Sequence, residues 1–424
     1  MEHVDSYYAA SAHSSPSHEP LREQVTADVC VVGGGIAGCA TALELAERGY
    51  RVVLLEAERI GWGASGRSGG QAIFGYAAGQ DKLVAQVGRD CARRMWDVTV
   101  EALDYVRDRV ARHAIDCDLQ WGQAHLAVKP RHVDELQAWR RELEDELDYR
   151  SLSWLDRDAT RSLVASDRYH GALFDSRSGH LHPLNYTLGL AAAARAAGVR
   201  MFEGSRVTGI AGGDPATVRT GSGEVRARHV ALCCNAYMDD RVSRKLRNRI
   251  MPVGTYIVAT EPLGEARIRS ILRDNVACSD VNWVLDYFRR SADHRLLFGG
   301  RVSYSGLDPL GTARATRARM VRAFPQLADA KIEYAWGGLV DITMNRAPDF
   351  GRIAPNVYYV QGFSGHGIAL AGMSGRLIAE AIAGQAERFD MYSRINHHDF
   401  PGGKLLRMPA LVLAMAWFRL KDLL

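Results

Sequence analysis

The first ordered pattern along the chain is an apolar strand, a glycine-rich turn, a helix and a second apolar strand. Residues 28–32 (DVCVV) predict a short buried strand, and residues 51–55 predict another. Between them, 36–48 has an apolar helical face made by Ile36, Ala40, Leu43 and Ala46. Gly49 ends this helix, because the left-handed conformation that follows a helix favours glycine. Such a β-α-β unit predicts a parallel sheet.

Later patterns are mixed, and they predict a second sheet. Residues 87–149 are rich in charge and mostly helical in period, with one short strand near 124–128. Residues 251–301 alternate between apolar and polar positions, which is typical of strands. The remaining expected elements are helices at 188–197 and 368–382 and strands at 200–202, 207–210, 230–234, 255–259, 284–287, 296–298 and 357–360. No internal repeat is visible.

Size and charge narrow the class of protein. A chain of 424 residues exceeds one ordinary hydrophobic core, so two domains are expected. Hydrophobic residues (47%) and charged residues (24%) are mixed as in globular proteins. The net charge of +4 comes with no basic tract, which argues against a nucleic-acid partner. The seven scattered cysteines favour reduced core thiols over a metal site.

The two ends of the chain bear on its location. The polar start at 1–26 has no charged-then-apolar progression, so a cytoplasmic protein is expected. Residues 404–424 contain the apolar stretch MPALVLAMAWFRL, which is too short to span a bilayer. A helix packed on its own domain is favoured there, and a helix lying on a membrane surface is the alternative.

The turn after the first strand predicts a dinucleotide site. Gly33, Gly35 and Gly38 in VVGGGIAG have the GxGxxG spacing between a strand and a helix. The first allows the tight turn, the second lets amides approach a diphosphate, and the third lets helix and strand pack closely. Glu56 ends the second strand, where a carboxylate accepts hydrogen bonds from ribose hydroxyls. A tight turn and a solvated strand-end charge are the alternatives.

A long loop after the second strand favours FAD over NAD as the ligand. Residues 61–71 (GWGASGRSGGQ) are small and hydroxyl-rich, which suggests close approach to a further part of a large ligand. Ser65, Arg67, Ser68 and Gln71 are expected to line the flavin or the diphosphate. A flexible surface loop is the alternative. No second GxGxxG unit follows, so one dinucleotide site is expected, with electrons from a small substrate or a protein partner.

Several longer motifs carry a family resemblance. They are SYYAAS, VVGGGIAG, GASGRSGGQ, RARHVALCCNAY, LDYFRRSADHRLLFGGR, WGGLVDITMNRAPDFGR and GFSGHGIALAGMSGRLIAEAIAGQAERFD. On these motifs the chain resembles the D-amino acid oxidase superfamily of FAD-dependent amine oxidoreductases over nearly its whole length. The resemblance implies an α/β fold with a Rossmann-type (GR2-like) FAD-binding domain and an interleaved α+β substrate domain that carries an antiparallel sheet.

The expected domain boundaries combine the resemblance with the interleaved pattern. An N-terminal arm covers 1–26, and a helical segment covers 393–424. The FAD-binding domain is expected at 27–90, 150–245 and 330–392, and the substrate domain at 91–149 and 246–329.

The resemblance also implies roles for individual residues. Val207 is expected to contact the adenine end, and His366, Gly367 and Ile368 to meet the isoalloxazine, where the dipole of a helix starting after Gly367 would stabilise a reduced anionic flavin. His366 adds positive charge or a hydrogen bond, or is an ordinary loop histidine. The remaining expected cofactor residues are Ile36, Ala37, Ala57, Gly66, Gly70, Asn235, Gly337 and Gly365. His366, Tyr287, Arg301 and Trp336 are the expected catalytic residues, with Arg289 as a further candidate on the substrate side.

Each candidate on the substrate side has a plainer alternative. Tyr287 and Trp336 would then only fill the core. Arg289 would be a solvated strand residue, and Arg301 a partner in an ion pair at a sheet edge.

Two departures from the family pattern refine the expected chemistry. In the amino acid oxidase branch, an arginine holds the substrate carboxylate where this chain has Val340, which favours an amine substrate. Cys278 is the nearest candidate for a flavin-linking cysteine, and a buried structural thiol is favoured over it, so FAD is expected to be non-covalent. The expected reaction is hydride transfer from a CH-NH carbon to flavin N5, with dioxygen as acceptor and hydrogen peroxide as product. The alternatives are a flavin dehydrogenase, an amino- or hydroxy-acid oxidoreductase of this fold, and a non-catalytic flavin-binding scaffold.

Overall fold

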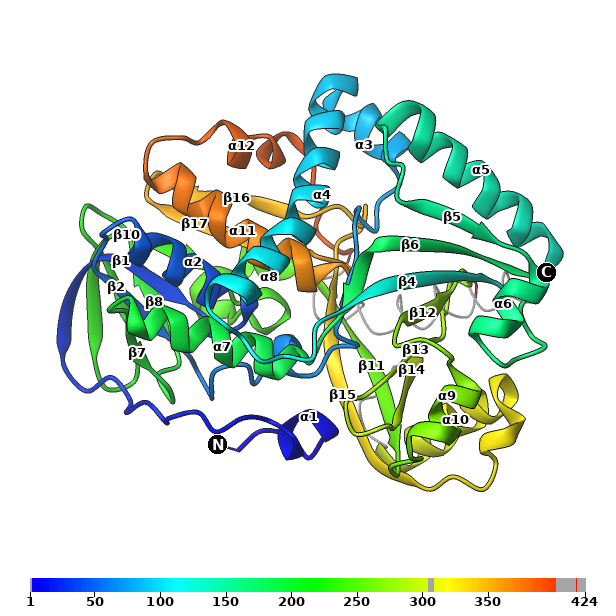
Figure 1. The fold of residues 1–424 in the computed structure, drawn as a ribbon. Coiled ribbons are helices and arrows are strands. Elements are labelled where there is room, and N and C mark those ends of the chain that lie inside the picture. Colours follow the sequence, from blue (N-terminus) through cyan, green and yellow to red (C-terminus); the bar gives the residue numbers. More distant parts are fainter. Residues whose placement is uncertain (1, 304–308, 402–416, 418–424) are drawn as a thin grey trace.

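Two β-sheets organise the computed structural model, which describes residues 2–303, 309–401 and 417 (Figure 1). The first sheet has a parallel centre, in which β1 pairs with β2 and β10, β2 with β7, and β10 with β17. Its strand order is β16 (Asp349–Ala354), β17 (Val357–Gln361), β10 (Glu224–Leu232), β1 (Gln24–Val32), β2 (Val52–Leu55) and β7 (Arg200–Phe202). A hairpin of β8 (Gly209–Ala211) and β9 (Ala216–Arg219) extends it from β10.

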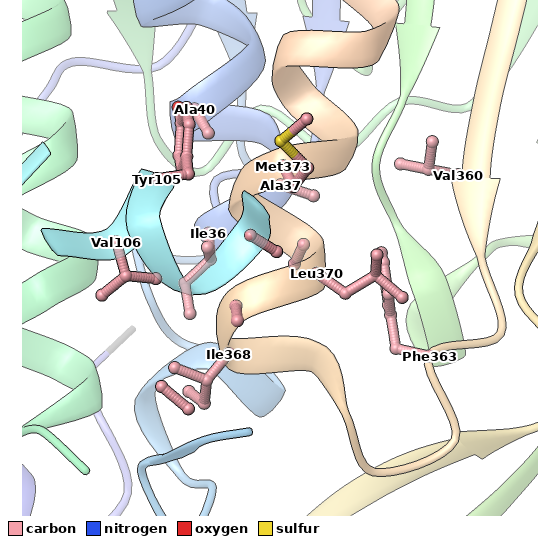
Figure 2. Close-up of a cluster of buried hydrophobic side chains, with 14 of the residues drawn as sticks. Ile36, Ala37, Ala40, Tyr105, Val106, Val360, Phe363, Ile368, Leu370 and Met373 are labelled. Atoms are coloured by element: carbon pink, nitrogen blue, oxygen red, sulfur yellow. The ribbon is translucent and has the colours of Figure 1, made fainter. Parts of the chain in front are cut away.

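The helices that cover this sheet pack through small and apolar side chains. They are α2 (Ile36–Glu47), α4 (Arg89–Arg112), α7 (Pro183–Ala196) and α11 (Gly367–Ile382). Figure 2 shows Ile36 and Ala40 of α2 beside Tyr105 of α4 and Ile368 of α11. A Cβ at Gly375 would lie 2.5 Å from the amide nitrogen of Thr41, so α11 and α2 are in backbone contact. This contact brings the N-termini of the two helices to the same side of the sheet.

The second sheet is largely antiparallel. Its order is β15 (Ile332–Ile342), β11 (Met251–Thr260), β14 (Leu296–Ser303), β13 (Tyr287–Arg290), β12 (Ala277–Asp280), β4 (Gln120–Ala127), β6 (Gly171–His180) and β3 (Gln71–Ala72), with β5 (Leu152–Leu155) paired to β6. The helices of this half are α5 (Pro130–Leu147), α6 (Arg157–Leu163), α9 (Glu265–Ile271) and α10 (Pro309–Ala323), as Figure 1 shows. Phe288 and Phe298 stack in parallel, and Phe324 meets Phe288 edge-on, so aromatic packing fills the core here.

Connecting helices and turns complete the described part of the chain. They are α1 (Tyr7–Ala10), η1 (Ala64–Gly66), α3 (Gln80–Val87), η2 (Asn235–Tyr237), α8 (Asp240–Asn248), η3 (Pro325–Leu327), α12 (Glu387–Asp390) and η4 (Tyr392–Arg394). The arm expected at 1–26 is ordered: Ser6 caps α1, and Tyr7 and Tyr8 are buried. No helix among the described residues is both long and apolar enough to cross a bilayer.

The β-α-β start and the parallel sheet confirm the prediction from periodicity, while several boundaries differ. The strand expected at 230–234 is the end of the longer β10, the strand expected at 284–287 begins only at Tyr287, and the expected helix at 188–197 begins earlier, at Pro183. Proline at the first helical position and the His182 side chain, which accepts the Asn185 N–H, explain the earlier start.

Four strands that the sequence places in the FAD-binding ranges join the second sheet instead of the first. They are β3, β5, β6 and β15. Segments of the two sheets therefore alternate along the chain more often than the expected domain boundaries allow. Those boundaries stay a prediction. The helix expected within 404–424 lies outside the described residues, apart from Trp417.

Candidate functional site

The turn between β1 and α2 is shaped by contacts that exclude side chains. Gly33 has φ of 110°, and a Cβ on it would lie 2.7 Å from the carbonyl oxygen of Cys233. A Cβ on Gly38 would lie 1.8 Å from the carbonyl oxygen of Gly33. The first turn of α2 therefore rests directly on the strand. Its free amides and positive dipole end face the space in front of the sheet, which is the geometry that binds a diphosphate.

Glu56 directly follows β2 and lies beside this turn. One carboxylate oxygen accepts the Gly34 N–H at 2.5 Å, and the other accepts the Glu58 N–H at 2.9 Å. Burial raises the pKa of Glu56, and these amide hydrogen bonds oppose that rise. The carbonyl oxygen of Glu56 accepts the Ser205 N–H at 2.8 Å, which brings the segment containing buried Val207 alongside. Glu56 and Val207 thus lie at one end of the site.

The loop 61–71 is packed across the start of α2, unlike the flexible surface loop that was its alternative. Ser65, in η1, accepts the N–H of Ile36, the first residue of α2, on its Oγ at 3.0 Å. A Cβ on Gly66 would lie 2.1 Å from the carbonyl oxygen of Gly61, so the loop is closed tightly on itself. Ser65 therefore lies where the α2 amides face the site.

Arg67 and Trp336 form one structural unit. The Arg67 guanidinium lies 4.0 Å from the centre of the Trp62 ring, and its Nε donates to the carbonyl of Trp62. Its Nη2 is buried without a hydrogen-bond partner among the described residues, and burial lowers the pKa of Arg67. The Arg67 carbonyl accepts the indole N–H of Trp336 at 3.0 Å. Trp336 is buried and packs edge-on against Tyr8, so these contacts hold the 61–71 loop in place.

Tyr287 and Arg289, neighbours on β13, clamp the glycines at the end of the loop. Tyr287 packs so closely that a Cβ on Gly69 would lie 2.7 Å from its ring, and burial raises the pKa of its phenol. Arg289 donates to the carbonyls of Gly69 and Leu181 and to the Tyr8 hydroxyl, at 2.9 to 3.0 Å. Arg289 is thus a buried anchor of the loop, neither a solvated strand residue nor a group open to substrate.

The remaining loop and strand candidates are placed less centrally. Gln71 donates to the carbonyl of Cys278 at 3.2 Å, and Cys278 is buried in β12. Gly70 has φ of 78°, and Ser68 accepts its N–H at 3.4 Å. Arg301 lies in β14 opposite Tyr256, and its side chain lies outside what the structure describes.

The loop before α11 brings His366 toward the same space. Gly365 has φ of 102°, with nothing within 4 Å of the position of a Cβ. The Nδ1 of His366 is buried without a hydrogen-bond partner among the described residues. Burial, with Arg346 and His125 nearby, lowers the pKa of His366 to about 4. The imidazole is therefore neutral at pH 7, which leaves a hydrogen bond, and not positive charge, as its contribution.

Asp341 is a site residue that the sequence analysis missed. Its Oδ2 accepts the Phe363 N–H at 2.7 Å, and its main-chain carbonyl accepts the Ser364 N–H at 3.1 Å. Burial raises the pKa of Asp341 to about 6, and the Phe363 amide and Asn235 side chain oppose that rise. Asn235, with φ of 51°, accepts the Gly362 N–H at 3.4 Å. A lone carboxylate between Val340 and Ile342 was the available signal.

The donor set suits an adenine dinucleotide with a flavin. The turn at 33–38, the loop at 61–71 and the loop at 362–368 meet where α2 and α11 begin. An anionic, hydroxyl-rich ligand would form hydrogen bonds with several groups here. They are the amides at two helix N-termini, the carboxylate of Glu56, which suits a ribose, and the buried Nη2 of Arg67, which has no partner among the described residues. On β15, a Cβ on Gly337 would lie 2.8 Å from the Tyr256 ring, while a Cβ on the next residue, Gly338, would lie 3.1 Å from the Arg67 side chain.

Comparisons with known proteins identify relatives over the whole chain. A family model described as FAD dependent oxidoreductase matches residues 28–381. Gamma-glutamylputrescine oxidoreductase of Escherichia coli (strain K12) is 44% identical over 421 residues, covering 99% of both chains. A probable oxidoreductase OrdL of Haemophilus influenzae is 40% identical over 426 residues, covering 100% of this chain and 98% of the relative.

Solved structures share the fold at lower identity. Glycine oxidase from Geobacillus kaustophilus superposes with a TM-score of 0.73 at 21% identity, covering 89% of this chain and 100% of that one. L-proline dehydrogenase from P. horikoshii superposes with a TM-score of 0.69 at 21% identity, covering 89% and 98%.

Proposed function

Because the chain belongs to the family of FAD-dependent oxidoreductases, we propose that it oxidises the CH-NH bond of an amine that resembles gamma-glutamylputrescine. Dioxygen would be the electron acceptor, and hydrogen peroxide the product. One observation carries the choice of substrate, namely the 44% identity to gamma-glutamylputrescine oxidoreductase across 99% of both chains. Val340, at the position where the amino acid oxidase branch has its carboxylate-binding arginine, supports an amine over an α-amino acid.

The cofactor would be held by the two helix N-termini and the loops between them. Amides at the start of α2 and Ser65 would face the diphosphate, Glu56 the ribose, and the Val207 backbone the adenine. His366, Gly367 and Ile368 would lie at the isoalloxazine. We propose that FAD is bound without a covalent link, since Cys278 is fully buried in β12 against Phe288.

The chain's own residues would orient the amine and keep water away from the reacting carbon. When bound, FAD supplies the acceptor for a hydride. A buried phenol at Tyr287 and a neutral imidazole at His366 offer hydrogen bonds without charge, so neither group stabilises an ammonium. The amine would therefore react in its neutral form, and the imine product would be hydrolysed in water.

An anaerobic reduction panel tests this function. The yellow protein is mixed with gamma-glutamylputrescine, putrescine, sarcosine, D-alanine and a hydroxy acid, and the bleaching of the flavin is followed. The first compound is expected to bleach it fastest, and peroxide is expected to form under air. Faster bleaching by D-alanine, sarcosine or the hydroxy acid would contradict the amine assignment, and rapid bleaching without peroxide would indicate a dehydrogenase. A protein that stays colourless with excess FAD would contradict the whole proposal.

A further inference from the structure

Arg346 is a desolvated cation without a partner among the described residues. In the described part of the chain its guanidinium has no hydrogen bond and no ion pair, and desolvation lowers its pKa with no acidic side chain opposing it. Arg67 and Arg290, whose pKa values are lowered too, each have acidic side chains nearby. Taking a guanidinium out of water without a counter-charge costs free energy, so such a group commonly binds a ligand.

The turn that carries Arg346 is held in place against the loop before α11. Arg346 has φ of 61°, and its N–H is bound by the Thr343 carbonyl at 3.1 Å. Asn345 accepts the Ala347 N–H at 3.1 Å and donates to the Asn396 carbonyl at 3.0 Å. A Cβ on Gly362 would lie 2.6 Å from the Thr343 side chain, so the turn and the loop are in direct contact. Arg346 is therefore presented beside the loop that ends at His366.

The imidazole of His366 lies near this guanidinium, and that of His125 lies near His366. Nδ1 of His366 and Nε2 of His125 are both buried without a hydrogen-bond partner among the described residues. Arg346 and His125 both act electrostatically on His366, so the three groups share one region although they come from three separate segments. The Trp139 ring meets His125 edge-on, with ring centres 5.3 Å apart, which limits where that imidazole points. A guanidinium without a counter-charge complements a carboxylate.

The proposed substrate class supplies a carboxylate of this kind. A gamma-glutamyl group is joined through its side-chain carboxyl and so keeps a free α-carboxylate, far from the carbon that is oxidised. On the basis of the function proposed above, we propose that Arg346 binds this remote carboxylate. Recognition would then use a cation six positions beyond Val340, where the amino acid oxidase branch has its own arginine.

A matched pair of substrates tests the assignment, because putrescine lacks the carboxylate. Steady-state kinetics and flavin spectra are measured for the holoenzyme and for R346M, R346K and R290M. We expect R346M to raise KM for gamma-glutamylputrescine about 30-fold while kcat changes little and putrescine kinetics stay as in wild type. R346K should fall between, because it keeps the charge and loses the bidentate geometry. R290M, which removes a similarly desolvated arginine elsewhere, should match wild type.

Two results would overturn the proposal. They are an equal loss with both substrates, and a shifted flavin spectrum in R346M, since either would assign Arg346 to the cofactor. If R346M does not retain FAD, the R346K variant tests the proposal in its place. The ratio of its KM for gamma-glutamylputrescine to its KM for putrescine must then be higher than in wild type.

A binding measurement separates failure of this proposal from failure of the proposed function. If wild type oxidises neither amine, the oxidised proteins are titrated with γ-aminobutyrate and with n-butylamine, and the flavin absorbance is followed. A response to γ-aminobutyrate that is lost in R346M supports the carboxylate site. An absent response, or the same response in both proteins, overturns it.

Discussion

The indole N–H of Trp336 donates to the main-chain carbonyl of Arg67 over 3.0 Å, which ties strand β15 of the second sheet to the loop that crosses the start of α2 in the first half of the molecule. Ser65 of the same loop accepts the Ile36 N–H, so the Trp336 hydrogen bond joins the two halves at the cofactor site, together with that from Arg289 to the Gly69 carbonyl.

Replacing Trp336 by phenylalanine should weaken cofactor retention more than catalysis. W336F keeps most of the buried ring and removes the hydrogen bond, which contributes about 1 kcal/mol. We expect a lower melting temperature and several-fold weaker FAD binding, measured by flavin fluorescence, with kcat of the loaded enzyme nearly unchanged. W154F, on β5, is the control and should retain FAD normally. A fall in kcat at unchanged FAD affinity would instead make Trp336 a catalytic residue.

Adding one methyl group at Gly38 should abolish the cofactor site. The new Cβ would lie 1.8 Å from the Gly33 carbonyl oxygen, so the helix must move away from the strand, at a cost of about 3 kcal/mol or more. We expect G38A to be purified colourless or not to fold. G212A, where no atom lies within 4 Å, should keep the yellow colour and the stability of wild type. Normal absorbance in G38A would show that this contact is not needed.

Asp341 should make the stability of the protein depend on acid pH. Burial raises its pKa to about 6, above the ordinary value of 3.8, so the folded state binds the proton more tightly than the unfolded state. Its contribution is therefore most favourable below pH 4 and is lost as pH rises to 6, by about 3 kcal/mol at most.

The D341N variant isolates this contribution. Urea unfolding of wild type and D341N at several pH values should show that the variant gains stability relative to wild type as pH rises from 4 to 6. A constant difference over this range would mean that Asp341 does not titrate there.

His366 should not set the pH dependence of turnover near neutrality. Its pKa is lowered to about 4, so it is neutral throughout the range from pH 5.5 to 9. H366Q should therefore lower kcat/KM by a similar factor at every pH in that range, because only a hydrogen bond is lost. An acidic limb near pH 6.5 in wild type that disappears in H366Q would contradict this assignment.

What the sequence by itself determined is local. The strand, the glycine turn and the helix at 28–48 follow from short-range rules of periodicity and backbone freedom, and the family motifs identified the cofactor and the type of enzyme. Glu56 was found for the same reason, because its position at the end of a strand is set by neighbours in the chain.

Only the tertiary structure decided which side chains from distant segments meet. Arg289 was expected to face the substrate or the solvent, and it anchors Gly69, Leu181 and Tyr8 instead. Asp341 and Arg346, which has no partner among the described residues, were not identified, because a single carboxylate in a strand and an arginine in a turn are only weak local signals. Their roles depend on burial and on contacts between segments far apart in the sequence, which no pattern of nearby residues reports.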